Sequence, residues 1–184
     1  TAIVDKEWPA FKAFPNQDYG TSYSMMWDDN NVYVAFKSTD TTIDEGIWSA
    51  GAGDYFMLSF NPASLDTAEQ GDGTTDHGVQ VFFERKADNT WAVSSRFKGT
   101  KVGSDELIKA YFAGAEGTPV EAIFAIPLKE YFGLAEDQIK NGMQFNYQFI
   151  HNFKMADGGY QYGPVIVDTF KGKEDVIKPV RSEE

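Results

Sequence analysis

The sequence predicts an all-β protein, an antiparallel β-sandwich with a jelly-roll or immunoglobulin-like two-sheet architecture, in a single domain spanning residues 1–184. About eight short runs of alternating apolar and polar residues follow one another, separated by turn-forming residues. The 17 Gly and 7 Pro residues suit a chain with many turns, and helical periodicity is almost absent. Apolar residues make up 42% of the chain and aromatic residues 15%, which is enough to fill a core between two sheets.

The strongest element is a hairpin over residues 23–37. Its centre, from Asp28 to Asn31, is a cluster of Asp and Asn residues, which accept left-handed backbone angles and bond to their own backbone in turns. On both sides of this turn, residues alternate with the period of a half-buried strand. We expect the later strands to stack against this hairpin, whose core side is formed by Tyr23, Met25, Trp27, Val32, Val34 and Phe36.

The segments on either side of the hairpin are less regular. Residues 1–22 contain Pro9 and Pro15, which cannot donate to a strand ladder, so an edge strand and a loop are predicted there. Residues 38–53 form a polar loop that contains a lone tryptophan, Trp48.

The rest of the chain is predicted to consist of strands and one helical turn. Segment 107–113 is ambiguous, and its pattern favours a strand. Residues 171–184 form a charged tail that we expect to be frayed. The other predicted elements are strands at 54–60, 78–86, 91–97, 119–127, 143–154 and 160–168, with a helical turn at 128–132. Alternation along these strands places in the core Phe56, Leu58, Phe60, Val79, Val81, Phe83, Phe145, Tyr147 and Phe149.

Composition excludes several classes of function. The net charge of −12 argues against nucleic acid and anionic membranes, which select basic surfaces. The absence of cysteine excludes disulfides, Cys-based zinc sites, cysteine nucleophiles and covalently attached c-type haem. No apolar run is long enough to insert across a membrane. Because the sequence opens at Thr1, we expect a mature chain or a module cut from a larger protein.

Several motifs, in their order along the chain, resemble the family 9 carbohydrate-binding modules, which are DOMON-like β-sandwiches. The resemblance runs from about residue 20 to about residue 168, with the same order of strands. The motifs are Trp27-Asp28-Asp29-Asn30-Asn31-Val32-Tyr33-Val34, Thr39-Asp40, Gly53-Asp54 with Phe56, Gly78-Val79-Gln80-Val81, Val120 to Pro127, and Phe145-Asn146-Tyr147-Gln148-Phe149.

This resemblance implies a sugar slot built from two aromatic residues and polar side chains on one face of a sheet. Trp48 stands where the first of the family's stacking tryptophans stands. The second is not reproduced at a matching place, and the nearby candidates are Tyr160, Tyr162 and Phe170. Met57 and Phe82 occupy places where the family commonly has an acidic and a basic sugar contact, which implies a more apolar slot.

Strand alternation adds amide side chains to this picture. Amides beside an aromatic residue suit a sugar, because the C–H face of a pyranose packs on a ring and its hydroxyls need polar partners. The alternative interpretation is that these amides are ordinary solvated positions of a sandwich. The non-core face is expected to hold Gln80, Gln148, Asn146 and Asn152 with Met57, Phe82 and Ile150. The predicted ligand-binding residues are Trp48, Gln80, Gln148, Asn152, Tyr160 and Tyr162.

A calcium site is a further expectation, since the resemblance implies calcium in many modules of this kind. Asp40, Asp44 and Glu45 are the predicted ligands, with Asp72 and Asp76 as a second group of oxygen donors. Neither group matches a defined calcium loop. The alternative is that both groups are solvated acids on an acidic protein.

Haem binding is the alternative function. Relatives with the same type of sandwich use methionine with histidine or lysine as axial ligands. Met57 on the predicted ligand face, paired with Lys154 or with His151, has the right residue types for a b-type haem electron-transfer domain. Alternation places Lys154 on the face of Met57 and His151 on the core side. The simpler interpretation is that Met57 packs under a loop.

An enzymatic function is not predicted, because two histidines, no cysteine and no nucleophile-elbow motif leave nothing to assemble a catalytic triad. The abundant acidic residues leave a pair of carboxylates for glycoside hydrolysis as the alternative, but the sequence places none of them in an apolar setting that would raise its pKa. We therefore expect a non-catalytic, extracellular or cell-surface module of a bacterial secreted protein, which binds a polysaccharide or oligosaccharide.

Overall fold

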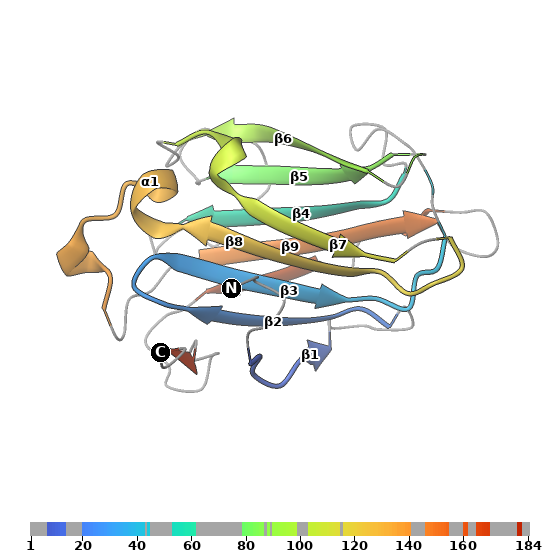
Figure 1. The fold of residues 1–184 in the computed structure, drawn as a ribbon, viewed down its shortest axis with the longest axis horizontal. Coiled ribbons are helices and arrows are strands. Elements are labelled where there is room, and N and C mark those ends of the chain that lie inside the picture. The colour runs from blue at the N-terminus through green and yellow to red at the C-terminus, as the bar shows by residue number, and fades with distance from the viewer. Residues whose placement is uncertain are drawn as a thin grey trace.

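The structure, a computed structural model, describes residues 7–13, 20–42, 44, 53–61, 79–86, 88, 90–98, 103–114, 116–140, 146–154, 160–161, 165–169 and 180–181. In these residues the chain forms two stacked β-sheets with a short helix at one end (Figure 1). The predicted all-β sandwich is confirmed.

The first sheet is built around the predicted hairpin, in which β2 and β3 pair from Ser22 with Lys37 to Trp27 with Val32. In the tail predicted to be frayed, the structure has a short strand, β12, that pairs with β2 in parallel. The remaining neighbours in this sheet are antiparallel. The strands are β1 (Lys12–Ala13), β2 (Ser22–Trp27), β3 (Asn31–Lys37), β8 (Glu121–Pro127) and β7 (Lys109–Ala113), in that order, with β12 (Val180–Arg181) beside β2.

The second sheet lies behind the first in Figure 1 and is antiparallel throughout. The strand predicted at 160–168 is confirmed in its described parts, because β10 and β11 pair with successive parts of β9, while residues 162–164 lie outside the described residues. The order of the strands is β10 (Tyr160–Gln161), β9 (Asn146–Lys154), β4 (Tyr55–Asn61), β5 (Val79–Arg85) and β6 (Trp91–Lys98), with β11 (Val165–Thr169) also beside β9.

Helical structure in the described part of the chain is short. The predicted helical turn is confirmed as α1 (Leu128–Phe132), which ends at Gly133 in a left-handed conformation with φ of 70°. Two 3-10 turns, η3 (Asp105–Leu107) and η4 (Glu136–Gln138), were not predicted. None of the helices among the described residues has the length and apolar character needed to cross a membrane.

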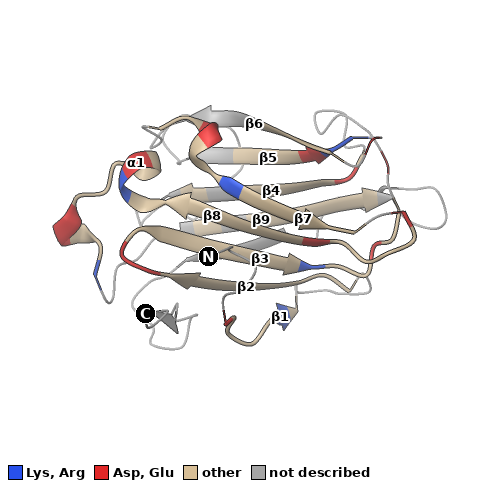
Figure 2. Ribbon diagram, in the orientation of Figure 1, with Lys and Arg blue, Asp and Glu red and all other residues tan. Residues whose placement is uncertain are grey.

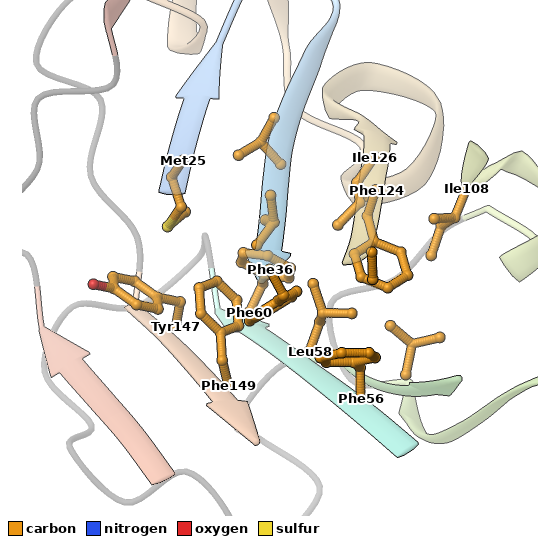
Figure 3. Close-up of a cluster of buried hydrophobic side chains, with 14 of the residues drawn as sticks. Met25, Phe36, Phe56, Leu58, Phe60, Ile108, Phe124, Ile126, Tyr147 and Phe149 are labelled. Carbon is orange, nitrogen blue, oxygen red and sulfur yellow. The ribbon is translucent and has the colours of Figure 1, made fainter. Parts of the chain in front are cut away.

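The main core lies between the two sheets and is rich in aromatic rings. Phe36 from the first sheet stacks on Phe56 from the second at 4.9 Å between centroids, and it contacts Phe149 edge-on at 5.4 Å. Figure 3 shows these rings, with Leu58 and Phe124, pointing toward one another from the facing strands. The alternation predicted for β2, β3, β4 and β9 is therefore confirmed for the core side.

Part of the outer face of each sheet is also buried. On the first sheet, Trp8 packs against a cluster of Met26, Tyr33 and Ala125, and the hydroxyl of Ser24 donates to the carbonyl of Pro9 at 2.9 Å. On the second sheet, a separate buried cluster consists of Tyr55, Met57, Phe82 and Ile150. We call this second group the outer cluster.

Charged residues are concentrated at the ends of the strands rather than along them. Figure 2 shows that the described bodies of the labelled strands are mostly tan, while red and blue residues lie mainly near the strand ends and at α1. Backbone alternation fills the strand interiors with apolar side chains, so charge is left to the ends. At one of these ends the charged side chains are themselves buried. Buried charged groups are uncommon, so this end differs in its chemistry from the rest of the fold.

Candidate functional site

Polar and charged side chains gather at one end of the sandwich, at the right of Figure 1. Strands β3, β5 and β9 end there, and β4 begins there. We call this group the polar end. It consists of Thr21, Ser38, Asp40, Asp54, Arg85, His151 and Asn152, all of them buried.

Arg85, the last residue of β5, is at the centre of the polar end and is 1% exposed. Its guanidinium donates from Nη1 to the carbonyl of Thr42 at 3.1 Å and from Nη2 to the carbonyl of Gly114 at 2.6 Å. Nη1 also lies 3.9 Å from Oδ2 of Asp54, and the guanidinium carbon is 5.6 Å from the ring centre of Trp91. A buried charge is costly unless it is paired, so Arg85 needs these partners. They come from three segments of the chain, at Asp54, Thr42 and Gly114, and Arg85 therefore holds these segments together.

Asp44 and Asp54 hold together the two ends of the segment that carries Trp48. The backbone N–H of Asp54 donates to the carbonyl of Asp44 at 2.8 Å, and the backbone N–H of Asp44 donates to Oδ2 of Asp54 at 3.0 Å. The backbone N–H of Arg85 donates to the carbonyl of Asp54 at 2.8 Å. Segment 45–52 therefore starts and ends at one point of the fold. We call this point, formed by Asp44 and Asp54, the neck.

The carboxyl group of Asp54 has an unusual proton affinity. Burial, followed by the negative charge of Asp40, raises the pKa of Asp54 to about 7. The hydrogen bond from the Asp44 backbone and the charge of Arg85 act in the opposite direction, while the charge of Asp44 adds a smaller upward effect. Asp54 is 2% exposed, so water screens these effects little. A carboxyl group with such a pKa changes its charge near neutral pH.

Asp40 supplies the second buried carboxylate, just after β3. Its Oδ1 accepts from the backbone N–H of Thr42 at 3.0 Å and from the hydroxyl of Thr42 at 2.8 Å. The other oxygen, Oδ2, is buried and has no hydrogen-bond partner within the described residues, and the same holds for Oδ1 of Asp54. Leaving a buried acceptor unpaired costs about 1–3 kcal/mol, so two of them in one network call for an explanation.

His151 lies between the polar end and the core, in contact with both. Its ring stacks on Phe56 at 4.3 Å between centroids, and its Nδ1 lies 3.0 Å from the hydroxyl of Thr21. Burial, followed by the nearby charge of Arg85, lowers the pKa of His151 to about 3. The imidazole therefore stays neutral at physiological pH, and its alternation toward the core is confirmed.

The predicted calcium ligands fall at or beside the polar end. Asp40 is 6% exposed, Asp44 is half-buried at the neck, and Glu45 lies outside the described residues, as do Asp72 and Asp76. Calcium needs six to eight oxygen ligands. The described part of the chain contains no group of three or more His, Cys, Asp or Glu residues placed to hold a metal ion. Asp40 and Asp54 offer two unpaired oxygens, which is too few to fit calcium by themselves.

The predicted ligand face is different from the open slot expected. Met57, Phe82 and Ile150 lie in the buried outer cluster, so no ligand reaches them in this structure. Asn152 is also fully buried, and its Nδ2 donates to the carbonyl of Gly53 at 2.7 Å. In this position the amide of Asn152 fixes the backbone beside the neck, and its role as a sugar contact stays a prediction.

The two glutamines lie at a distance from the neck along the sheet. In the register, Gln80 on β5 and Gln148 on β9 both stand opposite Ser59 of β4, while Asn152 stands opposite Tyr55. Four residues along a strand span about 13 Å. The side chains of both glutamines lie outside the described residues. One sugar ring is too short to join these two rows, so a single ring does not contact both the row of Gln80 and Gln148 and the row of Asn152.

The predicted aromatic platforms are only partly placed. Trp48, Tyr162 and Phe170 lie outside the described residues, and of Tyr160 only the backbone is described, paired with Lys154. Their role in binding stays a prediction.

Of the two predicted pairs of haem ligands, the pair of Met57 with His151 is excluded by the structure. Phe56 stands opposite His151 and Met57 stands opposite Ile150, so His151 and Met57 lie on opposite faces of the second sheet. His151 faces the core and Met57 faces outward, so these two side chains cannot ligate the same iron. The side chain of Lys154 lies outside the described residues, so the pair of Met57 and Lys154 stays a prediction.

Sequence reasoning missed Arg85 and Asp54 as the organising residues of this end. A signal for Arg85 was present, because Val81, Phe83 and Arg85 share one strand face and the first two were placed in the core. A charged residue on a core-facing row indicates a buried ion pair. In the sequence, Asp54 stands out only as part of the Gly53-Asp54 motif.

The comparisons with known proteins bear on the fold. No protein-family model and no curated protein sequence matches the chain. A family 9 carbohydrate-binding module from Caldicellulosiruptor kristjanssonii in complex with cellotriose is similar in structure, with a TM-score of 0.54 at 14% identity, covering 89% of this chain and 73% of the other. A family 9 module from the same organism in complex with glucose has a TM-score of 0.54 at 13% identity, covering 97% of this chain and 92% of the other. The chain therefore has the β-sandwich fold seen in family 9 carbohydrate-binding modules.

Proposed function

We propose that the chain is a non-catalytic carbohydrate-binding module that takes a β-linked glucose oligosaccharide at the loops around the neck, with Trp48 as the stacking residue. The observation that carries this proposal is the shared fold with two modules whose structures contain cellotriose and glucose. In this chain the segment with Trp48 is held at both ends by the hydrogen bonds between Asp44 and Asp54. A stacking residue on a segment held at both ends loses less conformational freedom when a ligand binds.

The buried outer cluster limits where a sugar can lie. Because the middle of the outer face is closed at Met57 and Phe82, binding at the end of the sandwich is favoured over binding along the face. Gln80 and Gln148 then contact only the far units of a longer oligosaccharide, about 13 Å along the strands. We further propose that the chain works as one module of an extracellular or cell-surface protein.

The test is a calorimetric titration with glucose, cellotriose and longer cello-oligosaccharides. Each hydrogen bond to solvent-exposed hydroxyls contributes only about 0.5–1.5 kcal/mol net, so dissociation constants on the order of micromolar to millimolar are expected. Replacement Trp48→Ala should weaken binding at least tenfold. The matched control is Tyr111→Ala, which removes an aromatic residue that is 43% exposed on β7, and which should leave the affinity unchanged.

Length dependence separates the two parts of the predicted site. Replacements Gln80→Leu and Gln148→Leu should affect only the longer oligosaccharides and leave glucose binding unchanged. If no saccharide binds across a broad panel, or if Trp48→Ala binds as tightly as the wild type, the proposed function is wrong.

A further inference from the structure

The exposed large apolar side chains of the described residues gather on one side of the sandwich. They are Val93, which is 42% exposed, Leu107, which is 39% exposed, and Tyr111, which is 43% exposed. Val93 lies on β6, Leu107 on η3 and Tyr111 on β7. β6 is the last strand of the second sheet, and β7 is the last strand of the first. Exposed apolar residues that gather at one place in this way indicate an interaction site.

Val93 is exposed although its side chain faces the first sheet. In the register of β5 and β6, Val93 stands opposite Phe83, which is 3% exposed in the core between the sheets. Residues directly opposite each other in antiparallel strands point to the same face of the sheet. The difference in exposure therefore comes from the facing layer, whose described strands cover Phe83 and leave Val93 open.

The described first sheet is one strand too narrow to cover β6. Phe112 of β7 lies 6.1 Å from Phe83 and stacks on Trp91 at 4.1 Å between ring centroids, so β7 packs over β5 and over the start of β6. In Figure 1, β6 forms the upper border of the second sheet, and β7 runs below it in the layer in front. A further strand beside β7 would lie over β6 and cover Val93. A strand added to β6 instead would leave Val93 open.

The backbone of β7 can pair with such a strand. β7 pairs with β8 on one side, and no strand of the described residues pairs with it on the other. Backbone N–H and C=O groups point alternately to the two sides of a strand, so about half of those in β7 point away from β8. An edge of this kind binds an extended chain through main-chain hydrogen bonds.

The side chains of β7 indicate the chemistry of the strand that fits. Lys109 and Tyr111 lie on the outer face of the first sheet, because Ala110 between them stands opposite Phe124 of the core. Lys109 is exposed and forms no ion pair with the described residues. A lysine on an edge strand disfavours pairing with most chains. An acidic residue opposite this lysine makes a favourable cross-strand pair, so Lys109 selects for an acidic strand.

We propose that an extended segment of a partner protein adds to β7 as a further, antiparallel strand of the first sheet, with alternate apolar residues facing β6 and an acidic residue opposite Lys109. Antiparallel pairing continues the pattern of β3, β8 and β7. The added strand covers Val93 on its inner face and contacts Tyr111 on its outer face. This interaction is separate from saccharide binding and does not depend on it.

A second copy of this chain fits the same edge less well. Two antiparallel β7 strands would be related by a two-fold axis perpendicular to the sheet, so both copies would have their second sheets on the same side. Because the second sheet extends beyond β7, the two β6 strands would then occupy the same space (Figure 1). A single extended segment avoids this overlap.

The test is an NMR titration of the full chain with a synthetic peptide of sequence Thr-Val-Thr-Val-Glu, with Gly and Ser at both ends. In the proposed register its Glu stands opposite Lys109, and its two Val residues face β6. The amide resonances of β7 and of Val93 should shift, and the β7 amides that point away from β8 should become protected from exchange with solvent. If the peptide shifts none of these resonances up to millimolar concentration, the proposal is wrong.

Backbone methylation of the peptide separates strand addition from contacts made by side chains alone. Two peptides are compared, each with N-methyl groups on one alternate set of residues. The peptide methylated on the side that faces β7 cannot donate to its carbonyls and should bind at least about tenfold more weakly than the other. If both bind as tightly as the unmethylated peptide, no ladder forms and strand addition is overturned.

Charge reversal tests the register. Lys109→Glu should weaken binding of the peptide at least about threefold, and a peptide with Lys in place of its Glu should prefer this variant to the wild type. The control Lys140→Glu makes the same change of charge at an exposed lysine after η4 and should leave both affinities unchanged. If the two variants weaken binding alike, net charge alone attracts the peptide, and the pairing with Lys109 is overturned.

Val93→Lys tests the position of the added strand over β6. The side chain is exposed, so the variant should keep the wild-type melting temperature, but the new charge would be buried by the peptide and should weaken binding at least about tenfold. An unchanged affinity would overturn this position. Sedimentation of the chain without peptide provides the last comparison. A dimer with protected β7 amides would mean that a second copy occupies the edge, and the proposed partner would be wrong.

Discussion

The ring of His151 stacks on Phe56 at 4.3 Å with an interplanar angle of 10°, and Asp54 lies two residues before Phe56. Two groups at one end of the core, His151 and Asp54, thus have pKa values that are shifted in opposite directions. The pKa of His151 is lowered to about 3 by burial and then by Arg85, and the pKa of Asp54 is raised to about 7 by burial and then by Asp40. Their effects on stability have opposite signs.

The first prediction concerns the dependence of stability on pH. Between about pH 4 and 6.5, His151 is largely protonated in the unfolded chain and neutral in the folded chain. This residue therefore lowers the free energy of unfolding as the pH falls. In the same range the folded chain binds a proton at Asp54 that the unfolded chain has lost, so this residue makes stability rise as pH falls. The contributions of His151 and Asp54 to the slope of the unfolding free energy against pH largely cancel. Together, these two groups should make the stability of the wild type almost independent of pH in this range.

Single replacements separate the two slopes. In His151→Asn only the contribution of Asp54 remains, and stability should rise by roughly 4 kcal/mol as pH falls from 7 to 4, as an upper value. In Asp54→Asn only the contribution of His151 remains, and stability should fall as pH falls below about 6.5. Urea denaturation at a series of pH values measures both. Parallel profiles for the two variants and the wild type would show that neither group is perturbed.

The second prediction tests Arg85 as the centre of the polar end. Replacement Arg85→Met keeps much of the volume but leaves Asp54 without its ionic partner and the carbonyls of Thr42 and Gly114 without donors. Breaking a buried pair in this way costs roughly 3–5 kcal/mol. The comparison is Lys37→Met, which removes an exposed ion pair to Glu121 at 4.0 Å and should cost less than about 1 kcal/mol. Similar costs for both variants, measured by chemical denaturation, would contradict a buried role for Arg85.

The sequence predicts well those features of the structure that depend only on residues close together in the chain. The alternation around Phe36 and Phe149 correctly indicated the core, because side-chain direction in a strand follows from neighbouring residues alone. Local alternation also indicates the strand at 160–168, whose described parts pair with β9.

The polar end was less accessible to prediction. Asp40, Asp54 and Arg85 each resemble surface residues in the sequence, and only the pairing of β4 with β5 brings the last two together. Alternation also tells which side of a sheet Met57 faces but not whether another part of the chain covers that side. Contacts between distant segments decide both questions, and a single sequence does not record them.

The third prediction concerns the attachment of α1. The hydroxyl of Tyr131 donates to Oδ1 of Asp105 at 2.9 Å and is fully buried, joining the helix to η3. Burial and the neighbouring carboxylate both raise the pKa of Tyr131, so the hydroxyl stays protonated and remains a donor at neutral pH. Replacement Tyr131→Phe should destabilise the fold by about 1–2 kcal/mol, because the carboxylate loses its donor. A thermal melt measures this loss, and an unchanged melting temperature would mean that water replaces the donor without cost.

The fourth prediction tests the assignment of the core in the hairpin. Trp27 is 4% exposed at the end of β2 and pairs with Val32 across the hairpin, on the face that packs between the sheets. Its removal in Trp27→Ala leaves a large cavity in a close-packed interior, and truncations of this kind cost roughly 3–5 kcal/mol. For a chain of this length, each kcal/mol lowers the melting temperature by about 2–4 °C. The variant should therefore melt roughly 6–20 °C below the wild type. Tyr111→Ala provides the control, since an exposed aromatic residue on the edge strand should change stability by less than about 0.5 kcal/mol. Equal melting temperatures for the two variants would mean that the hairpin faces are inverted, with Met26 and Tyr33 facing the core in place of Trp27 and Val32.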